Sequence, residues 1–275
     1  ESKHINRIVI NPTNNDIVLV AATGPLFGSG GDRGIYRTAD GGKTWTRTLS
    51  VDDDNGANDV AMSVTDPNIV YASMYQRRRT TCCMNGGGPG SGLWKSIDGG
   101  ATWKRVSGGG FPGGSLGRIA VEVFRGNANI VYAAVEGSAP GRVAPTEESA
   151  AAVAQGGTGG TTGLYRSDDG GATWALTFRN EPPSGGAGGL ADARPFYYSQ
   201  IRVDPKNPDR IYWMSSVFRV SNDGGKTYRR GALNLHTDWH AMWIDPRDPD
   251  HFILGMDGGI AQTYDGGGTY DFINS

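Results

Sequence analysis

Hydrophobic residues in this chain occur in short runs that alternate with polar positions, and each run stops at a turn-forming sequence. Ile201-Arg-Val203 precedes the turn 204–209, and Arg210-Ile-Tyr-Trp213 follows it. Alternation over a few residues, bounded by Pro, Asp, Asn and Gly, is typical of β-strands joined by tight turns. No long run has helical periodicity, so the pattern predicts an all-β protein.

The turns that interrupt these runs are of two repeating kinds. The first is rich in Asn, Asp and Pro and recurs at 11–16, 65–68, 125–129, 204–209 and 245–250. The second has the form Ser/Thr-x-Asp-Gly-Gly-x-Thr-Trp/Tyr and recurs at 38–45, 96–103, 167–174, 221–228 and 263–270. A motif that returns at intervals of tens of residues indicates a repeat architecture.

The second motif has a structural explanation at its conspicuous positions. Asp-Gly-Gly between two strand-like runs predicts a hairpin, because glycine adopts the positive φ angles that such turns need. The Ser or Thr hydroxyl and the Asp carboxylate can bond to backbone groups of the loop, and the terminal aromatic ring can pack into the sheet. We therefore predict structural roles for Asp40, Trp45, Asp98, Trp103, Asp169, Trp174, Asp223, Tyr228, Asp265 and Tyr270.

One unit of the repeat is strand, Asp/Pro turn, strand, variable loop, strand, Asp-Gly-Gly turn, strand. Repetition of four-stranded units about an axis describes a β-propeller. The sequence predicts a single propeller region over 1–275 with antiparallel blades at approximately 1–50, 51–107, 116–180, 196–233 and 239–275. The five blades either close on themselves or form part of a larger propeller.

The Ser/Thr-x-Asp-x-Gly-x-x-Trp pattern resembles the Asp-box (BNR-type) repeat of sialidase-type and sortilin-type propellers, and of xyloglucan-cleaving glycosidases. The whole chain is most similar to bacterial exported sortilin-like propeller proteins, often labelled glycosyl hydrolase, through stretches such as 76–79, 88–92, 194–200 and 238–246. The resemblance implies a propeller in an extracytoplasmic location, whether secreted, periplasmic or on the cell surface. Members usually have more blades, which implies further blades or a partner chain at the ring edges.

Composition excludes some partners and leaves others open. The net charge of −2 and the pI near 6.1 argue against a nucleic-acid partner, which would require a basic face. No apolar run approaches the length of a membrane span. The only cysteines, Cys82 and Cys83, are adjacent and have no zinc-site spacing. We predict no cofactor and no metal, and a protein, peptide or glycan as the ligand.

Topology places function at one end of the blades. In a four-stranded antiparallel unit the first and third turns lie at one end, and both kinds of short, uniform turn occupy these positions. The long, irregular segments fall at the other end, at 22–33, 51–57, 76–92, 107–117, 136–163, 179–197 and 231–239. Variable loops on a rigid scaffold are where binding and catalysis usually occur, so we predict one functional face there.

Counting outward from the turn of the fifth unit places candidate residues on that face. The count puts Asp238 opposite Asp257 and His240 opposite Gly255, with a slip of one or two residues allowed. Two carboxylates at a sheet end can flank a glycosidic bond, which makes Asp238 and Asp257 candidate catalytic residues. In an extended segment His236 and His240 would point the same way as Asp238, which makes the three residues a candidate metal-binding or acid/base cluster. The alternative is that the histidines bond to loop backbone while Asp238 caps a turn.

Basic and aromatic residues supply further candidate ligand contacts. Arg77 and Arg79 leave the second unit on the functional face and can grip a carboxylate, a sulfate or a sugar acid. The alternative is that this Arg-Arg-Arg run pairs with the acidic loop 52–54. Tyr197, Tyr198 and Trp239 can stack on sugar rings or peptide side chains, or pack between blades.

Three functions remain after this reasoning. The first is a binding scaffold that presents its loop-rich face to a protein, peptide or glycan, since no strong catalytic constellation accompanies the repeats. The second is a glycoside hydrolase that uses Asp238 and Asp257. The third is a subunit of a larger extracytoplasmic complex. The Asp-box indicates the fold and says little about activity, because a fold does not determine function.

Overall fold

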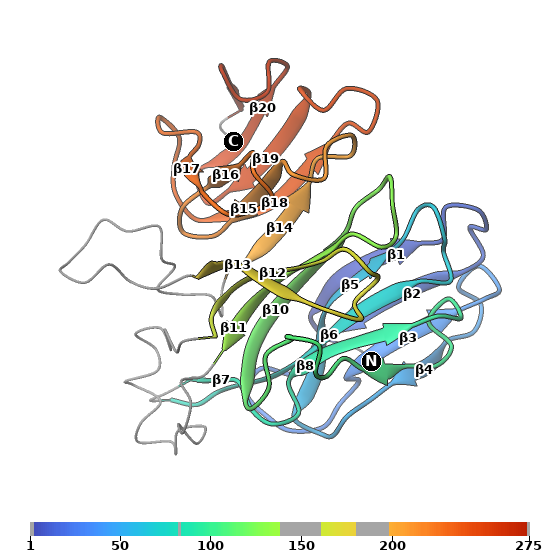
Figure 1. The fold of residues 1–275 in the computed structure, drawn as a ribbon. Helices are drawn as coiled ribbons and strands as arrows, with labels where there is room; N and C mark the ends of the chain where they lie inside the picture. Colours follow the sequence, from blue (N-terminus) through green and yellow to red (C-terminus); the bar gives the residue numbers. More distant parts are fainter. Residues whose placement is uncertain (1–2, 82–83, 138–160, 180–197, 274–275) are drawn as a thin grey trace.

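The computed structural model describes residues 3–81, 84–137, 161–179 and 198–273, which form 21 strands and no helix. The strands make separate antiparallel sheets in which consecutive strands pair in chain order (Figure 1). The prediction of an all-β fold with five four-stranded antiparallel blades is confirmed. No helix with the length and hydropathy needed to span a membrane occurs in these residues.

Each blade follows the predicted order of strands. Blade 1 contains β1 (Ile5–Ile10), β2 (Val18–Ala22), β3 (Gly34–Thr38) and β4 (Thr46–Leu49). Blade 2 contains β5 (Asn55–Met62), β6 (Val70–Arg79), β8 (Gly92–Ser96) and β9 (Lys104–Arg105), and β7 (Met84–Gly86) pairs with the end of β6. Blade 3 contains β10 (Leu116–Val123), β11 (Val131–Gly137), β12 (Gly163–Ser167) and β13 (Ala175–Arg179).

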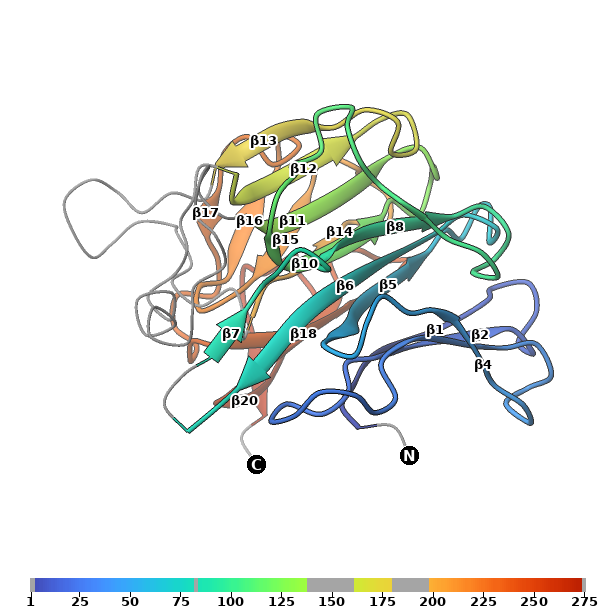
Figure 2. The ribbon, with the colours of Figure 1, turned by 90° about the horizontal axis from the view of Figure 1, so that it is seen from below.

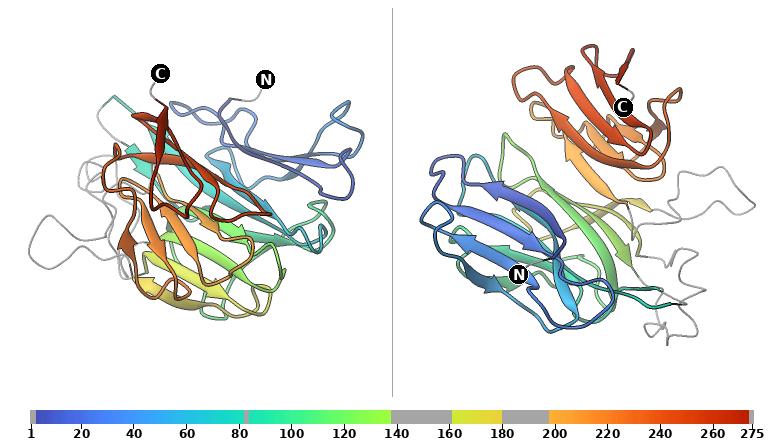
Figure 3. Two further views of the ribbon diagram at one scale, coloured as in Figure 1. Left: turned by 90° about the horizontal axis from the view of Figure 1, so that it is seen from above. Right: turned by 180° about the vertical axis from the view of Figure 1, so that it is seen from behind.

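The last two blades have shorter strands. Blade 4 contains β14 (Gln200–Val203), β15 (Ile211–Met214), β16 (Arg219–Ser221) and β17 (Arg229–Arg230). Blade 5 contains β18 (Trp239–Ile244), β19 (Phe252–Met256), β20 (Gly259–Thr263) and β21 (Asp271–Ile273). The blades follow one another around an axis as a five-bladed propeller, and the described ends of the chain lie toward the same side (Figures 2 and 3).

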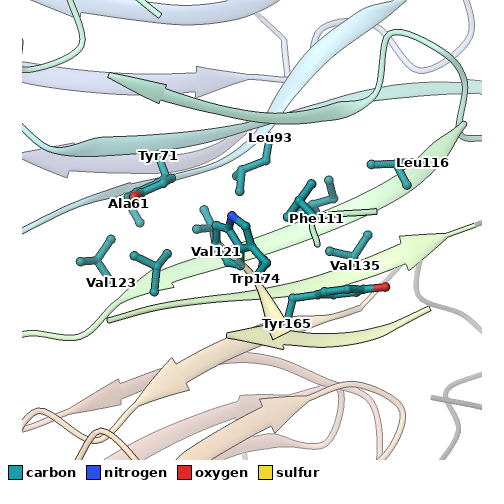
Figure 4. Packing of buried hydrophobic residues seen from close by; sticks show 13 residues of the cluster. Ala61, Tyr71, Leu93, Phe111, Leu116, Val121, Val123, Val135, Tyr165 and Trp174 are labelled. Carbon is teal, nitrogen blue, oxygen red and sulfur yellow. The ribbon is translucent and has the colours of Figure 1, made fainter. Parts of the chain in front are cut away.

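The hydrophobic core is divided among the junctions between consecutive blades. One cluster joins blades 1 and 2, one joins blades 2 and 3, one joins blades 3 and 4, and one joins blades 4 and 5. In the cluster between blades 2 and 3, the ring of Phe111 lies 5.1 Å from that of Trp174 in an edge-on contact and 6.0 Å from that of Tyr165 (Figure 4). Full burial of such rings provides most of the stabilisation at a blade junction.

Both kinds of turn lie at the same end of every blade. In each blade the backbone N–H of the first Asp-box glycine donates to a carbonyl of the Asp/Pro turn: Gly41 to Asp16, Gly99 to Asn68, Gly170 to Asn129, Gly224 to Asp209 and Gly266 to Asp250. The repeated bond ties the two hairpins of a blade together. We call this end the turn end and the opposite end, where β2 connects to β3 and β4 to β5, the loop end.

The Asp-box side chains close the second hairpin through a network that is nearly identical in the five blades. In blade 2 the Asp98 carboxylate accepts from the Thr102 hydroxyl at 2.5 Å, from the Thr102 N–H at 2.9 Å and from the Ser96 hydroxyl at 2.7 Å. These donors, led by the Thr102 hydroxyl, lower the pKa of Asp98 to about 2. The aspartates of the other four boxes likewise have pKa values of about 2.

Candidate functional site at the loop end of blade 5

The predicted carboxylate and histidine residues lie where blade 4 meets blade 5 at the loop end. The connection from blade 4 reaches β18 through residues 231–238, and the hairpin from β19 to β20 turns at Asp257 and Gly258. The segment is fastened to blade 4, because the Trp239 N–H donates to the Ser215 carbonyl at 2.9 Å and the Asp238 N–H to the Ser216 carbonyl at 3.4 Å. Rigid elements therefore hold the site on both sides.

The register of this hairpin differs from the simple count by one residue. Trp239 pairs with Met256 and Ala241 pairs with Gly255, so His240 is the extra residue of a bulge and does not face Gly255 as predicted. A bulge aims the side chain of its extra residue away from the regular alternation. Before the bulge the count holds, and the Asp257 N–H donates to the Asp238 carbonyl at 3.2 Å.

The segment that precedes β18 is not extended. The strand begins at Trp239, and Asp238 has a φ of 67°, in the left-handed region that non-glycine residues seldom occupy. The prediction that His236, Asp238 and His240 alternate along one face of an extended segment is therefore wrong. With the backbone in this conformation, the Asp238 N–H bonds to blade 4 and the Asp238 carbonyl accepts from the β19–β20 hairpin.

The bulge brings His240 onto Asp257. The His240 Nε2 atom lies 2.7 Å from the Asp257 Oδ1 atom, and the two side chains are 47% and 52% exposed. Tyr198, which is buried, packs its ring 5.0 Å from the imidazole ring at a tilt of 54°. The histidine is thus oriented by a carboxylate on one side and an aromatic ring on the other, while about half of its surface remains available to a ligand.

This arrangement has defined chemical capabilities. When imidazole is neutral and donates its Nε2–H to Asp257, its Nδ1 atom is a hydrogen-bond acceptor; when it is protonated, both nitrogens donate. The pair can therefore present an acceptor or a donor to a peptide amide or a sugar hydroxyl. Because the Asp257 carboxylate is already bonded to His240, it does not stand as an uncommitted partner for Asp238.

His236 lies beside this pair but makes local contacts. Its Nδ1 atom is 2.8 Å from the Thr237 carbonyl, as the loop-bonding alternative predicts. The His236 side chain also packs on Gly258, where a Cβ atom would come within 2.5 Å of the His236 Cβ atom. Among the residues that the structure describes, no group of three or more His, Cys, Asp or Glu side chains is arranged to hold a metal ion.

The remaining predicted contacts divide between the core and other blades. Trp239 is 2% exposed and packs on Phe218 with ring centroids 5.2 Å apart, so it is a core residue and not a ligand platform. Arg77 and Arg79 lie on β6 of blade 2, where they pair with β7 through the backbone. Tyr197, like Cys82 and Cys83, lies outside the described residues.

The middle arginine of the run supports the structural alternative for that segment. Arg78 forms an ion pair with Asp54 and also contacts Ser29. The Ser29 hydroxyl donates to the same Asp54 carboxylate at 2.7 Å. At this position the arginine run is used to join the loop that follows β2 to the loop that precedes β5.

Two groups of residues with clear roles escape sequence reasoning. The box threonines donate twice to each box aspartate, although the repeated Thr was visible in every copy: Thr44, Thr102, Thr173, Thr227 and Thr269. Ser215 and Ser216, which anchor β18 to blade 4, have no signal in the sequence because they act through main-chain carbonyls.

Comparison with known proteins supports the repeat and the fold. A family model described as BNR/Asp-box repeat matches residues 165–176, within blade 3. Together with the architecture, this match defines the chain as a propeller with BNR-type repeats. No curated protein matches the sequence.

Several solved structures are similar in fold. A GH74 xyloglucanase from Xanthomonas campestris is 15% identical with a TM-score of 0.56, and it is matched over 100% of this chain and 46% of its own. An ancestral GH74 enzyme is 17% identical with a TM-score of 0.58, over 99% of this chain and 31% of its own. This chain thus spans less than half of either enzyme, and at such identities the likeness shows the fold alone.

A third solved structure is that of a protein with a bound peptide. YCF48 bound to D1 peptide is 13% identical with a TM-score of 0.44, over 98% of this chain and 81% of its own. At that TM-score the likeness supports no inference about this chain.

Proposed function

We propose that this protein is a binding scaffold that holds a peptide or glycan segment at the loop end, with His240 and Asp257 as its polar anchor. The observation that carries the proposal is the 2.7 Å contact between these two side chains, which are half exposed and held by a bulge and a hairpin. Preorganised polar groups on a rigid scaffold lose little entropy on binding.

The ligand class follows from what the pair can bond to. Imidazole and carboxylate together offer donors and acceptors to the amides of a peptide or the hydroxyls of a sugar. Exposed Leu233, at 76%, and Ile260, at 49%, lie in the segments that flank the pair in sequence and can contribute apolar contact. A location of the protein outside the cytoplasm is also part of this proposal, and it rests on the resemblance to exported propellers.

Binding arrays test the proposal with a matched control. We would probe an array of peptides and an array of glycans with the unmodified chain, with His240→Ala and with His251→Ala, which removes a histidine from the turn end of the same blade. We expect the probes bound by the unmodified chain to be lost by His240→Ala and retained by His251→Ala. If both variants bind as the unmodified chain does, the anchor is wrongly placed.

A glycoside hydrolase remains the second candidate, because Asp238 and Asp257 are paired across the hairpin through their backbones. The array hits supply its substrates. Turnover of a bound glycan that is abolished by both Asp238→Asn and Asp257→Asn would favour hydrolysis, whereas binding without turnover favours the scaffold.

A further inference from the structure

A pit opens at the turn end, where the first strands of consecutive blades lie beside one another around the propeller axis. Its walls come from the first strands of blades 2, 3, 4 and 5 and from the Asp/Pro turns that follow them, and its volume is about 250 Å³. Pockets for drug-sized ligands have roughly 300–1,000 Å³, so this pit suits a group the size of one ring. We call it the axial pit, and the lining residues that matter here are Met62, Val64, Glu122, Arg202, Met242 and Trp243.

One register position on the first strands gives the axial pit its chemical character. In each blade the residue at this position pairs with a residue of the second strand, which pairs in turn with the residue just before the box Ser or Thr. The position is held by Glu122 in blade 3, Arg202 in blade 4 and Trp243 in blade 5. Blades 1 and 2 have only Val9 and Ala61 there. Three consecutive blades therefore place a group that can bond or stack at the same level of the axis.

The Glu122 carboxylate is held in place and still has an acceptor to offer. Its Oε2 atom lies 3.3 Å from Arg7 Nη2 and 3.6 Å from Arg202 Nη1, and the side chain is 20% exposed. Arg202 is itself fixed, because it donates to the Met242 carbonyl at 3.1 Å and to the Ile201 carbonyl at 2.7 Å. In the described part of the chain both contacts of the Glu122 carboxylate use Oε2, so Oε1 can accept from a ligand.

The charges at the floor of the axial pit balance one another. Arg7 and Arg202 are matched by Glu122 and by Asp59, which is 6% exposed and lies 3.7 Å from Arg7. The other charged lining residue, Arg125, is exposed at the rim, where solvent screens its charge. An ion of either sign would meet a like charge at this floor, whereas a neutral group with several hydroxyls can donate to the carboxylate.

The walls of the axial pit are apolar and include an aromatic face. Met62 and Met242 line it together with Trp243, whose ring is held by an edge-on contact with His251 at a centroid distance of 5.5 Å. A sugar ring matches this combination, because its C–H groups pack on an indole face while its hydroxyls bond to a carboxylate. The size, the charge balance and the aromatic wall thus point to the same class of ligand.

We propose that the axial pit binds one neutral sugar ring, with Glu122 Oε1 accepting from its hydroxyls and Trp243 packing on its apolar face. This site lies at the opposite end of the blades from His240 and Asp257 and does not depend on them. A single ring makes few contacts, so we expect a dissociation constant on the order of 1 mM. A ligand that weak is lost in the washes of an array, and its binding has to be measured at equilibrium.

Saturation-transfer difference NMR tests the proposal with glucose, galactose and mannose, each beside its uronic acid. We expect at least one neutral sugar to bind and its uronic acid to bind more weakly. Trp243→Ala should raise the dissociation constant about tenfold, and Val64→Phe, which adds a ring to the wall of the pit, should abolish binding. Trp45→Ala is the matched control, because Trp45 is a half-exposed tryptophan in the box of blade 1, and it should bind as the unmodified chain does.

His240→Ala separates this site from the loop-end anchor and should also leave sugar binding unchanged, while thermal unfolding checks that every variant is folded. The proposal is overturned if no neutral sugar binds, if a uronic acid binds as tightly as its neutral sugar, or if folded Trp243→Ala and Val64→Phe bind normally. Loss of binding in His240→Ala alone would place the sugar at the loop end and equally overturn it.

The source of the ring is determined with a trisaccharide that ends in the sugar that binds. If the trisaccharide binds at least as tightly as the free sugar and is lost in Val64→Phe, the axial pit takes the terminal unit of a glycan. If only the free sugar binds, the ligand is a monosaccharide. Either result supports a site for one sugar ring.

Discussion

Two histidine–aspartate pairs in blade 5 show how the ends of the propeller differ. At the turn end, His251 Nδ1 lies 3.8 Å from Asp245 Oδ2, and the side chains are 19% and 11% exposed. His251 also stacks on Tyr264 with ring centroids 4.4 Å apart and bonds to Gln262. At the loop end, the His240–Asp257 pair is closer, at 2.7 Å, and about half exposed.

This difference in exposure indicates that the loop-end pair, and not the turn-end pair, is available to bind a ligand. Asp245 is committed to its turn, because it accepts from the Arg247 N–H at 2.8 Å, and the Arg247 backbone and side chain lower the pKa of the Asp245 carboxyl. This aspartate recurs as Asp204 in the equivalent turn of blade 4, where it accepts from the Lys206 N–H. The pair at the turn end is thus built on a repeated turn residue. The pair at the loop end is built on a bulge that also occurs in blades 1 and 2, where the extra residue is Asn6 or Asn58 and not a histidine.

Among the substitutions considered, removal of a buried Asp-box aromatic residue should lower the stability of the protein most. Trp174→Ala leaves a cavity between blades 2 and 3, so we expect the free energy of unfolding to fall by about 3–5 kcal/mol. Trp45→Ala is the matched control, because the same box position is 44% exposed there, and its cost should be about 1 kcal/mol. Urea unfolding followed by circular dichroism measures both; equal losses would contradict the description of blade junctions.

Substitutions of the loop-end pair should affect binding and leave folding intact. His240→Ala and Asp257→Ala each remove the hydrogen bond between the two side chains, so we expect affinity for an array-selected probe to fall about tenfold or more. Titration calorimetry measures the affinity, and thermal unfolding of the same samples checks the fold. A comparable loss of melting temperature in these variants would mean that the pair is structural after all.

The box carboxylates should contribute to stability more modestly than the box aromatics. Asp98→Ala removes the acceptor of the Thr102 and Ser96 donors at a solvent-exposed turn, and we expect a loss of about 1–2 kcal/mol. Asp53→Ala, at another exposed acidic position, should change stability by no more than about 0.5 kcal/mol. Chemical denaturation measures the stability of both variants. Equal midpoints for Asp98→Ala and Asp53→Ala would show that the box network does not contribute to stability.

Acid should weaken the turn end gradually. The box aspartates have folded-state pKa values of about 2, below the ordinary value of 3.8. Their contribution is therefore fully present above the ordinary value and is lost as pH falls toward the folded-state values. We expect the melting temperature to decline between these two pH values, and less steeply in Asp98→Asn. A decline that is the same in both would assign acid sensitivity to other groups.

The two ends also differ in how well they could be predicted from sequence. The turn end follows from local chemistry, since Asp-Gly-Gly and Asn/Asp/Pro turns specify hairpins within a few residues. The loop end depends on contacts between blades. Counting from the turn placed Asp238 opposite Asp257, but the bulge that delivers His240 to Asp257 has no sequence signal, and a single extra residue reverses which way each side chain points.

Burial was equally difficult to anticipate at the loop end. Trp239 stands one residue from His240, yet it enters the core between blades 4 and 5 because the segment is bonded to Ser215 and Ser216 of blade 4. Sequence alone could not distinguish it from an exposed aromatic platform, because that distinction depends on the position of the neighbouring blade. Local motifs thus predict the repeating unit, whereas junctions between units determine the site.

Hydrogen exchange read by mass spectrometry, with and without the tightest array probe, tests most directly whether binding belongs to the loop end. The account predicts that the probe slows exchange in residues 231–241 and 255–261, around His240 and Asp257, and leaves the turns at 204–209 and 245–250 unchanged. Protection confined to those turns, or to the Asp-boxes, would contradict it.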